Sequence, residues 1–248
     1  MTALRILLPV LATASALGVD MLEKGWRTAS GIATLAFLLG TVTTEIIASR
    51  RAKTAKLALE SQRAEYLVTS FAAFGPLSNH MSLMAAAQTS RRRELAGPSL
   101  YAAAVAARSL VPVDGVRAAL FYRTVEDGKD VFLPHPVYWV GRGDRAQSRF
   151  VRGEGEGIDV WNAADQGSQS FYPDIADERP PNMDMNRPRT YAGFATVPIL
   201  AGDECVGLAT INTLEPNQLT SEDVGTLWVI AALSGAILGM VGCKWPGV

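Results

Sequence analysis

The chain has 248 residues, enough for one full domain with an appendage or for two small domains. Its formal net charge of -1 gives no overall electrostatic case for binding nucleic acid, and none is expected as a partner. The two cysteines, Cys205 and Cys243, are too few for a disulfide framework or a thiolate zinc site, and this usage fits a reducing compartment.

Two uncharged apolar runs, 6–19 and 28–44, lie close together at the N-terminus. An α-helix needs about 20 mostly apolar residues to cross the hydrocarbon core of a bilayer. Apolar residues extend each run beyond a single charge, Arg5 or Glu45, whose long side chain can reach the interface. Because the loop between the runs is short, residues 1–49 are predicted to form a transmembrane helical hairpin in the lipid bilayer.

Basic residues indicate how this hairpin is oriented. Four of them follow the second run: Arg50, Arg51, Lys53 and Lys56. The loop holds only Lys24 and Arg27, so we expect a multi-pass protein of the cell membrane with both termini in the cytoplasm. Two alternatives remain open: the first run is a cleaved signal peptide, or both runs are buried core helices.

Residues 50–96 are predicted to form a helical stalk or linker. The stretch 50–74 contains no Gly or Pro and has a heptad-like apolar pattern: Leu57, Ala64, Leu67, Phe71 and Phe74. Gly75-Pro76 should interrupt this helix, and a second helix is expected over 77–95. The basic residues 91–93 are expected to be a solvated helix end, and His80 a polar helix residue. Such a stalk would make a homodimer and carry a signal, and a plain linker is the alternative.

Gly97-Pro98 is predicted to begin a globular domain over 97–243, with Ser99 capping a helix that ends near 110. Strands are expected at 116–123 and 131–140 around a turn at 126–128, with Pro134 and Pro136 marking an edge or a bulge. The remaining expected elements are a helix at 158–164, a strand at 170–172, a loop at 177–188, strands at 191–200 and 205–212, and a helix from Thr220 to about 240. This order indicates an α+β fold with an antiparallel sheet flanked by helices.

Residues 99–240 resemble a GAF domain. The resemblance is carried by Val197-Pro198-Ile199, Val206-Gly207, the helix start Leu219-Thr220-Ser221-Glu222-Asp223, and the strand and turn of 171–178. It implies a GAF-like antiparallel sheet with a ligand pocket beneath the segment between the second strand and the later hairpin. Both faces of the strand 205–212 are apolar, so we expect helices on one face and the pocket lid on the other.

The resemblance also implies a set of ligand-binding residues, which combines aromatic walls with one Arg and one Asp. These candidates are Tyr138, Trp161, Phe171, Asp174, Arg189, Tyr191 and Asn212. Such a set suits a planar or anionic metabolite. The alternative is that the aromatic residues are core and the charged residues are surface. The identity of any cofactor is unknown, and no metal site is predicted.

The family's known chemistries fit this chain poorly. The cyclic-nucleotide signature is met at Asn212 and Asp223, but Thr213, Leu219 and Val224 replace its Lys, Phe and Glu. Cys205 lies too late in the chain for a bilin attachment, two cysteines do not supply a methionine-sulfoxide reductase, and His135 between two prolines is not expected to bind haem. No catalytic motif is present, so we predict a protein that is not an enzyme.

The final helix is apolar nearly all round, which predicts packing on the sheet and a dimer contact, or alternatively a third membrane segment. Together these features predict a membrane-anchored cytoplasmic small-molecule sensor without a catalytic output domain, signalling to an unidentified protein partner. The alternatives are a ligand-gated effector that perturbs the bilayer and a ligand-free dimerisation scaffold.

Overall fold

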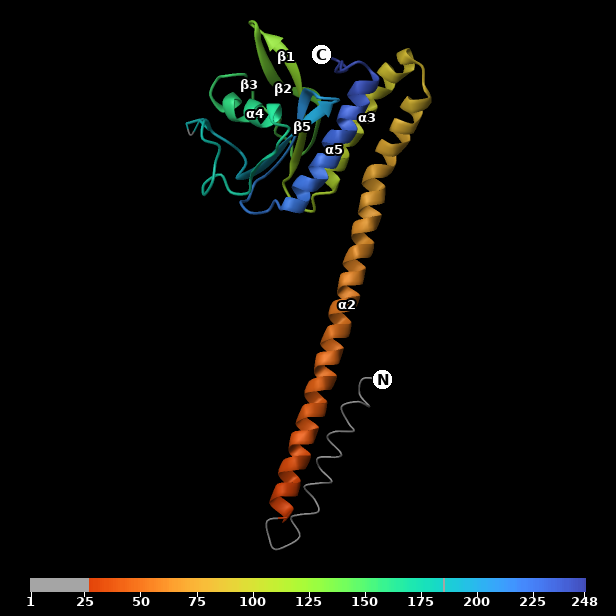
Figure 1. The fold of residues 1–248 in the computed structure, drawn as a ribbon, viewed down its shortest axis with the longest axis vertical. Coiled ribbons are helices and arrows are strands. Elements are labelled where there is room, and N and C mark those ends of the chain that lie inside the picture. The colour runs from red at the N-terminus through yellow and green to blue at the C-terminus, as the bar shows by residue number, and fades with distance from the viewer. Residues whose placement is uncertain (1–26, 185) are drawn as a thin grey trace. The chain divides into compact units, whose positions relative to one another are not determined.

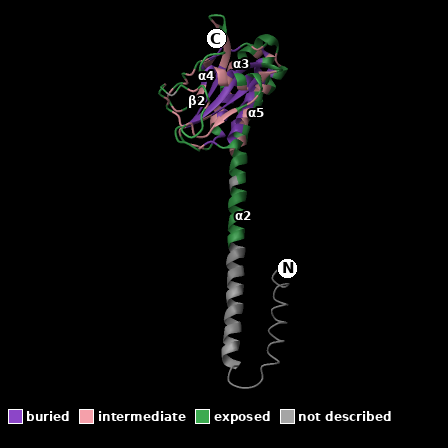
Figure 2. Ribbon diagram, turned by 60° about the vertical axis from the view of Figure 1, so that its left-hand side comes forward, coloured by how far each residue is buried: buried purple, intermediate pink, exposed green. Residues whose placement is uncertain are grey.

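A computed structural model describes the backbone of residues 27–184 and 186–248, and the side chains of 51–61, 63–184 and 186–248. The chain divides into two units, Met1–Glu65 and Tyr66–Val248. In the first unit the described backbone belongs to helix α2 (Arg27–Ala86) (Figure 1). The first apolar run of the predicted hairpin and its loop lie outside the described residues, as do the side chains of the second run. The described side chains of this unit, from Arg51 on, are exposed (Figure 2).

In the second unit, α2 continues through Gly75-Pro76 to Ala86, so the predicted interruption there is wrong. An interior proline costs a helix about 3 kcal/mol. Burial of Leu77 and Met84 in the domain core, both fully buried, offsets this cost. The helix ends where Arg92 donates to the carbonyls of Met84 (3.0 Å) and Ala85 (3.3 Å). Arg92 is therefore a cap for α2 rather than part of a solvated helix end.

Helix α3 (Thr89–Ser109) contains Gly97-Pro98, so this pair is not the boundary that the sequence predicted. Ser99 is not a cap either, because it is buried within α3 and donates to the carbonyl of Leu95 (2.7 Å). The compact unit begins at Tyr66, earlier than the expected domain start at 97, since the last turns of α2 contribute to the core. Tertiary packing has overridden two local helix-breaking signals.

The sheet is antiparallel throughout and has the strand order β3-β2-β1-β6-β5-β4. Its strands are β1 (Arg117–Glu126), β2 (Lys129–Gly141), β3 (Phe150–Val151), β4 (Ser170–Tyr172), β5 (Gly193–Ala201) and β6 (Glu204–Thr213). The predicted α+β fold with an antiparallel sheet is thereby confirmed. The predicted turn is also confirmed: Asp127 and Gly128 have φ of 50° and 76°, as a two-residue type I′ turn requires.

The predicted irregularity at Pro134 and Pro136 is a bulge. Phe121 pairs with Pro134 whereas Ala119 pairs with Trp139, so the register of β1 on β2 shifts between these pairs. A proline donates no ladder hydrogen bond, which favours such a break. The bulge carries His135 and Tyr138 out of the regular ladder.

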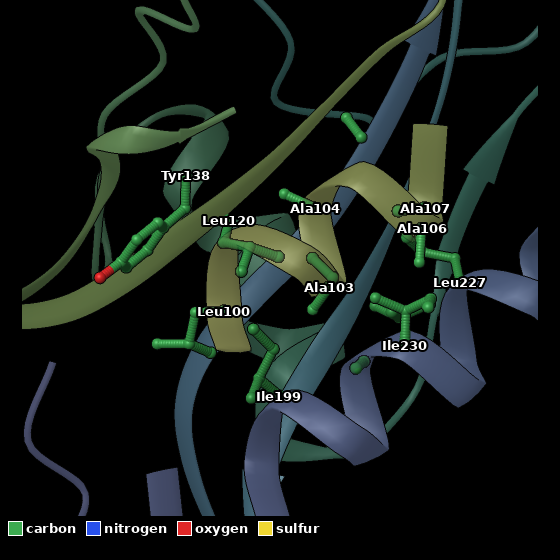
Figure 3. Close-up of a cluster of buried hydrophobic side chains, with 14 of the residues drawn as sticks. Leu100, Ala103, Ala104, Ala106, Ala107, Leu120, Tyr138, Ile199, Leu227 and Ile230 are labelled. Carbon is green, nitrogen blue, oxygen red and sulfur yellow. The ribbon is translucent and has the colours of Figure 1, made fainter. Parts of the chain in front are cut away.

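Helices α3 and α5 (Ser221–Met240) cover one face of the sheet (Figure 1). Figure 3 shows small side chains on α3 facing Leu227 and Ile230 of α5 and Leu120 and Ile199 of the sheet: Ala103, Ala104, Ala106 and Ala107. These alanines allow close approach of the helices. The predicted cap of α5 is confirmed as a capping box between Thr220 and Asp223.

Helix α5 is, within the described residues, the one helix long and apolar enough to cross a membrane by length and composition. Half of its most apolar stretch is buried inside the domain, against β5, β6 and α3. Gly235 shows how tight this packing is, since a Cβ there would lie 1.9 Å from the carbonyl oxygen of Leu200. Packing on the sheet accounts for the apolar character of α5.

The other face of the sheet is covered by α4 (Glu156–Asp165) and by the loops around 142–149 and 173–192 (Figure 1). Strand β6 is therefore buried on both faces apart from its first residue, as its two apolar faces predicted (Figure 2). Gly157 brings α4 against β3, because a Cβ there would lie 1.9 Å from the carbonyl oxygen of Val151. This second face positions the candidate site.

Candidate functional site

A cleft lies between the sheet and α4. Its floor is made by alternate residues of three strands: Arg117, Phe121, Phe194, Thr196, Thr210 and Asn212. The residues between them on β5 and β6, such as Ala195 and Ile211, point into the helix-covered core. Glu156, Asp159 and Val160 of α4 form one wall, and Pro180, Met183 and Tyr191 lie over the floor.

The cleft has a cavity volume of about 60 Å³, and about 650 Å³ of empty space when its open mouth is included. Since about 10–15 Å³ suffices for one water, the cavity has room for a few waters or a small ligand. A larger ligand requires the covering loop to move.

At one end of the cleft, Arg117 and Arg142 share the carboxylate of Asp144. Arg117 Nη1 donates to Asp144 Oδ2 and to the Asp144 carbonyl, both at 2.9 Å. Arg142 Nε donates to Asp144 Oδ1 (2.6 Å), and its Nη2 donates to Asn212 Oδ1 (2.9 Å). Thr190 also donates its hydroxyl to Asp144 Oδ2 (2.7 Å). This network ties β1, β6 and the two covering loops together.

Burial and the neighbouring charges together set the pKa values of Arg117 and Asp144. Desolvation lowers the pKa of Arg117, and Arg142 lowers it further while Asp144 raises it. For Asp144, burial alone would raise the pKa, but the hydrogen bonds from Thr190 and Arg142 and the charges of both arginines hold it below its usual value. Asp144 is therefore an ionised acceptor at neutral pH.

The α4 wall holds the loop 177–190 in place. Glu156 Oε1 accepts a hydrogen bond from Arg189 Nη2, and both side chains are largely buried. Asp159 accepts from the backbone N–H (2.9 Å) and the side-chain amide (2.8 Å) of Asn182. Burial raises the pKa of the neighbouring Tyr191 hydroxyl, so this phenol stays protonated.

Of the seven residues predicted to bind a ligand, Tyr191 and Asn212 line the cleft, and Arg189 is bonded to the lining residue Glu156. Trp161 is buried beside the cleft, stacked on Phe132 with ring centroids 3.8 Å apart.

The other three predicted residues lie elsewhere. Tyr138 packs on the helix-covered face, near Leu100 and Leu120 (Figure 3). Phe171 packs against the same core. Asp174 caps a local turn, accepting from the backbone N–H of Ala176 (2.9 Å). These three are not brought into the cleft.

Sequence reasoning missed Arg117, Arg142, Asp144 and Glu156. Arg117 carried a usable signal, because it is a charged residue followed directly by the apolar stretch 118–121 of β1. Arg142 lies between two glycines that match no phosphate-binding context. Glu156 follows Gly155 in a glycine-rich stretch that gave no sign of a partner, and in the structure Arg189 pairs with it.

His135 and Cys205 are both buried away from this cleft. His135 stacks on Tyr138 with ring centroids 3.8 Å apart, and its Nε2 lies 2.9 Å from the carbonyl of Pro246. Cys205 Sγ donates to the carbonyl of Gly207 (3.3 Å), and burial raises the pKa of this thiol. Within the described part of the chain, no group of three or more His, Cys, Asp or Glu residues is placed to hold a metal ion.

The family model of the GAF domain matches residues 102–238, more than half of the chain, and the chain belongs to this family. Among solved structures, it is similar to the free methionine-R-sulfoxide reductase from Neisseria meningitidis in complex with its substrate. That match has 15% identity and a TM-score of 0.50, and covers 70% of this chain and 92% of that one.

A GAF domain of a phosphoenolpyruvate-protein phosphotransferase from Coxiella burnetii matches with 19% identity and a TM-score of 0.46, covering 68% of this chain and 94% of that one. A putative GAF sensor protein from Burkholderia vietnamiensis matches with 16% identity and a TM-score of 0.45, covering 68% and 90%. At these identities the likeness concerns the fold alone. No curated protein matches this chain.

Proposed function

We propose that this chain is a membrane-anchored cytoplasmic sensor whose GAF domain binds a small molecule in the cleft between the sheet and α4. One observation carries the proposal: buried polar side chains of the sheet converge on a cavity that aromatic and aliphatic side chains also line. Buried polar groups cost free energy unless they are bonded, and a few of them in an apolar pocket are typical of ligand recognition. GAF homologues act as ligand-binding sensor domains, which agrees with this role.

The role we propose is binding rather than catalysis. The residues that line the cleft in the described structure include neither His nor Cys, and Glu156 and Asp159 are held by Arg189 and Asn182. A nucleophile with an adjacent base is therefore not assembled there. The buried, hydrogen-bonded Cys205 also argues against thiol chemistry.

Anchoring is proposed from the two uncharged N-terminal runs and from the basic residues that follow the second one. The full chain should remain in the membrane pellet after an alkaline carbonate wash and enter solution only with detergent. Recovery in the supernatant without detergent would refute the anchor.

A homodimer is proposed from apolar side chains that α2 exposes in a heptad-like pattern. Leu57, Leu67 and Phe71 are 55%, 54% and 77% exposed. A second copy of α2 would cover them, and ligand binding would be read by a protein partner through this helix. Cross-linking at a cysteine introduced at Phe71 should give dimers, whereas a cysteine at the exposed Glu65, on the outer side of the helix, should give fewer.

The binding proposal is tested by purifying the full chain in detergent and screening it for thermal stabilisation by a metabolite library. Native mass spectrometry would show any retained small molecule. Ser148→Trp should fill the mouth of the cleft and abolish binding, because Ser148 lines it. Gln147→Trp, on an exposed neighbour outside the lining, is the matched control. If nothing binds the unmodified chain, the scaffold hypothesis is favoured instead.

A further inference from the structure

The geometry of Arg117 points to the chemical class of the ligand, and we infer that the cleft recognises a small organic monocarboxylate. This inference rests on the proposed function and specifies it. The carboxylate would dock on the free edge of the Arg117 guanidinium, with the hydrocarbon part of the ligand in the apolar portion of the cleft.

Arg117 has hydrogen-bond donors that its bonds to Asp144 do not use. Both of its hydrogen bonds to Asp144 use Nη1. Its Nε is buried and has no hydrogen-bond partner among the described residues, although Arg117 lines the cavity and its side chain is 6% exposed. A buried donor without an acceptor is rare in a folded protein, and a bound water, ion or ligand atom would satisfy it.

The free edge has the shape of a carboxylate receptor. The N–H groups of Nε and Nη2 lie on the same edge of the planar guanidinium, so they point in parallel. Two parallel donors match the two oxygens of a carboxylate and form a bidentate pair. Thr196 lines the same floor, and its hydroxyl can donate a further hydrogen bond, whereas Thr210 donates its hydroxyl proton to the carbonyl of Ala119 (3.2 Å).

The surrounding charges favour a monoanion. Arg117 and Arg142 share the single carboxylate of Asp144, which leaves one positive charge for a ligand. At the far wall, Glu156 is already paired with Arg189, and Arg187 lies 3.8 Å from it. Asp159 faces the cavity, and among the described residues it is hydrogen-bonded only to the neutral Asn182, so it would repel a phosphate dianion.

The rest of the ligand must be small and apolar. Phe121, Phe150, Val160 and Phe194 line the cavity beside the polar floor. The cavity volume of about 60 Å³ accepts a short aliphatic chain directly, and it accepts a single aromatic ring if the covering loop moves outward. Butyrate and benzoate are the probes that follow from this size.

The experiment measures binding of these probes to the full chain by calorimetry and thermal shift. Butyrate and benzoate should bind at least about tenfold more tightly than butyramide and benzamide, which keep the shape and lose the charge. Inorganic phosphate should not bind. Arg117→Lys keeps the charge but lacks the two-donor edge, so it should weaken carboxylate binding at least about tenfold. Arg149→Lys, on an exposed arginine outside the cleft, should bind like the unmodified chain.

Equal affinity for the amides, or full affinity of a folded Arg117→Lys variant, would overturn the inference. If Arg117→Lys does not fold, the comparison of acids with amides on the unmodified chain still decides it. Binding of uncharged compounds that Ser148→Trp abolishes, without any carboxylate binding, would leave the sensor proposal standing and remove the carboxylate. If no compound of either kind binds, both proposals fail.

Discussion

Two glycines of α5 provide a matched test of how the domain is packed. At Gly235 a Cβ would lie 1.9 Å from the carbonyl oxygen of Leu200, whereas at Gly225 it would meet nothing within 4 Å. Ordinary contact begins at 3.4 Å, so Gly235→Ala must push α5 and β5 apart by about 1.5 Å. Overpacking of this kind typically costs about 1–3 kcal/mol. In both substitutions the change from Gly to Ala raises helix propensity by up to about 1 kcal/mol.

Gly235→Ala should therefore destabilise the domain, and Gly225→Ala should stabilise it slightly. The assay is thermal unfolding of the full chain in detergent, followed by circular dichroism. For a domain of this size 1 kcal/mol shifts the midpoint by about 2–4 °C, so the two variants should melt several degrees apart. Equal midpoints would refute the tight approach of α5 to β5.

Three further predictions concern protonation, capping and the covering loop. Burial lowers the pKa of His135 below 6.5, so on acidification the unfolded chain takes up a proton before the folded chain does, and the stability should fall as the pH drops below about 6.5. The melting temperature of His135→Phe should therefore depend less on pH between about pH 5 and 7, and identical slopes for the variant and the unmodified chain would count against this. Thr220→Ala removes the capping box of α5 and should lower the free energy of unfolding by about 0.5–2 kcal/mol in the same melting assay. The control Ser221→Ala, at the exposed next residue, should change it little. Glu156→Gln should weaken the bond to Arg189 and speed tryptic cleavage in the loop 177–190 by about tenfold. The surface control Glu154→Gln should not change the cleavage rate, and an unchanged rate for Glu156→Gln would mean that the Glu156–Arg189 pair does not hold the loop.

Local sequence signals predicted the elements that are stabilised locally. The turn at Asp127-Gly128 needs two residues with positive φ, and the sequence supplies residues that tolerate it. Thr220 with Asp223 is a reciprocal cap encoded within four residues. By contrast, Pro76 and Pro98 are local breakers inside helices whose faces are buried elsewhere in the fold, and no local pattern reports that burial.

The site was predicted less completely because the sequence pattern of a strand shows that side chains alternate, but does not show which of them face the cleft and which face the helix-covered core. Ser170 lines the cleft, and the adjacent Phe171 packs on the helix side. Tyr138 and Trp139 are divided between the two faces in the same way. When both faces of β6 are apolar, polarity cannot decide the orientation of its neighbours. Asn212 and Tyr191 were identified because the family resemblance, rather than alternation, indicated them.

Strand β6 has a consequence for anyone who wishes to redesign the cleft. Thr210 and Asn212 belong to the cleft, while Ala209 and Ile211 between them belong to the helix-covered core. A substitution in the cleft that displaced this strand would disturb the hydrophobic core at the same time. Positions in the covering loops, such as Ser148, carry no such coupling to the core, so changes of ligand preference are best introduced there.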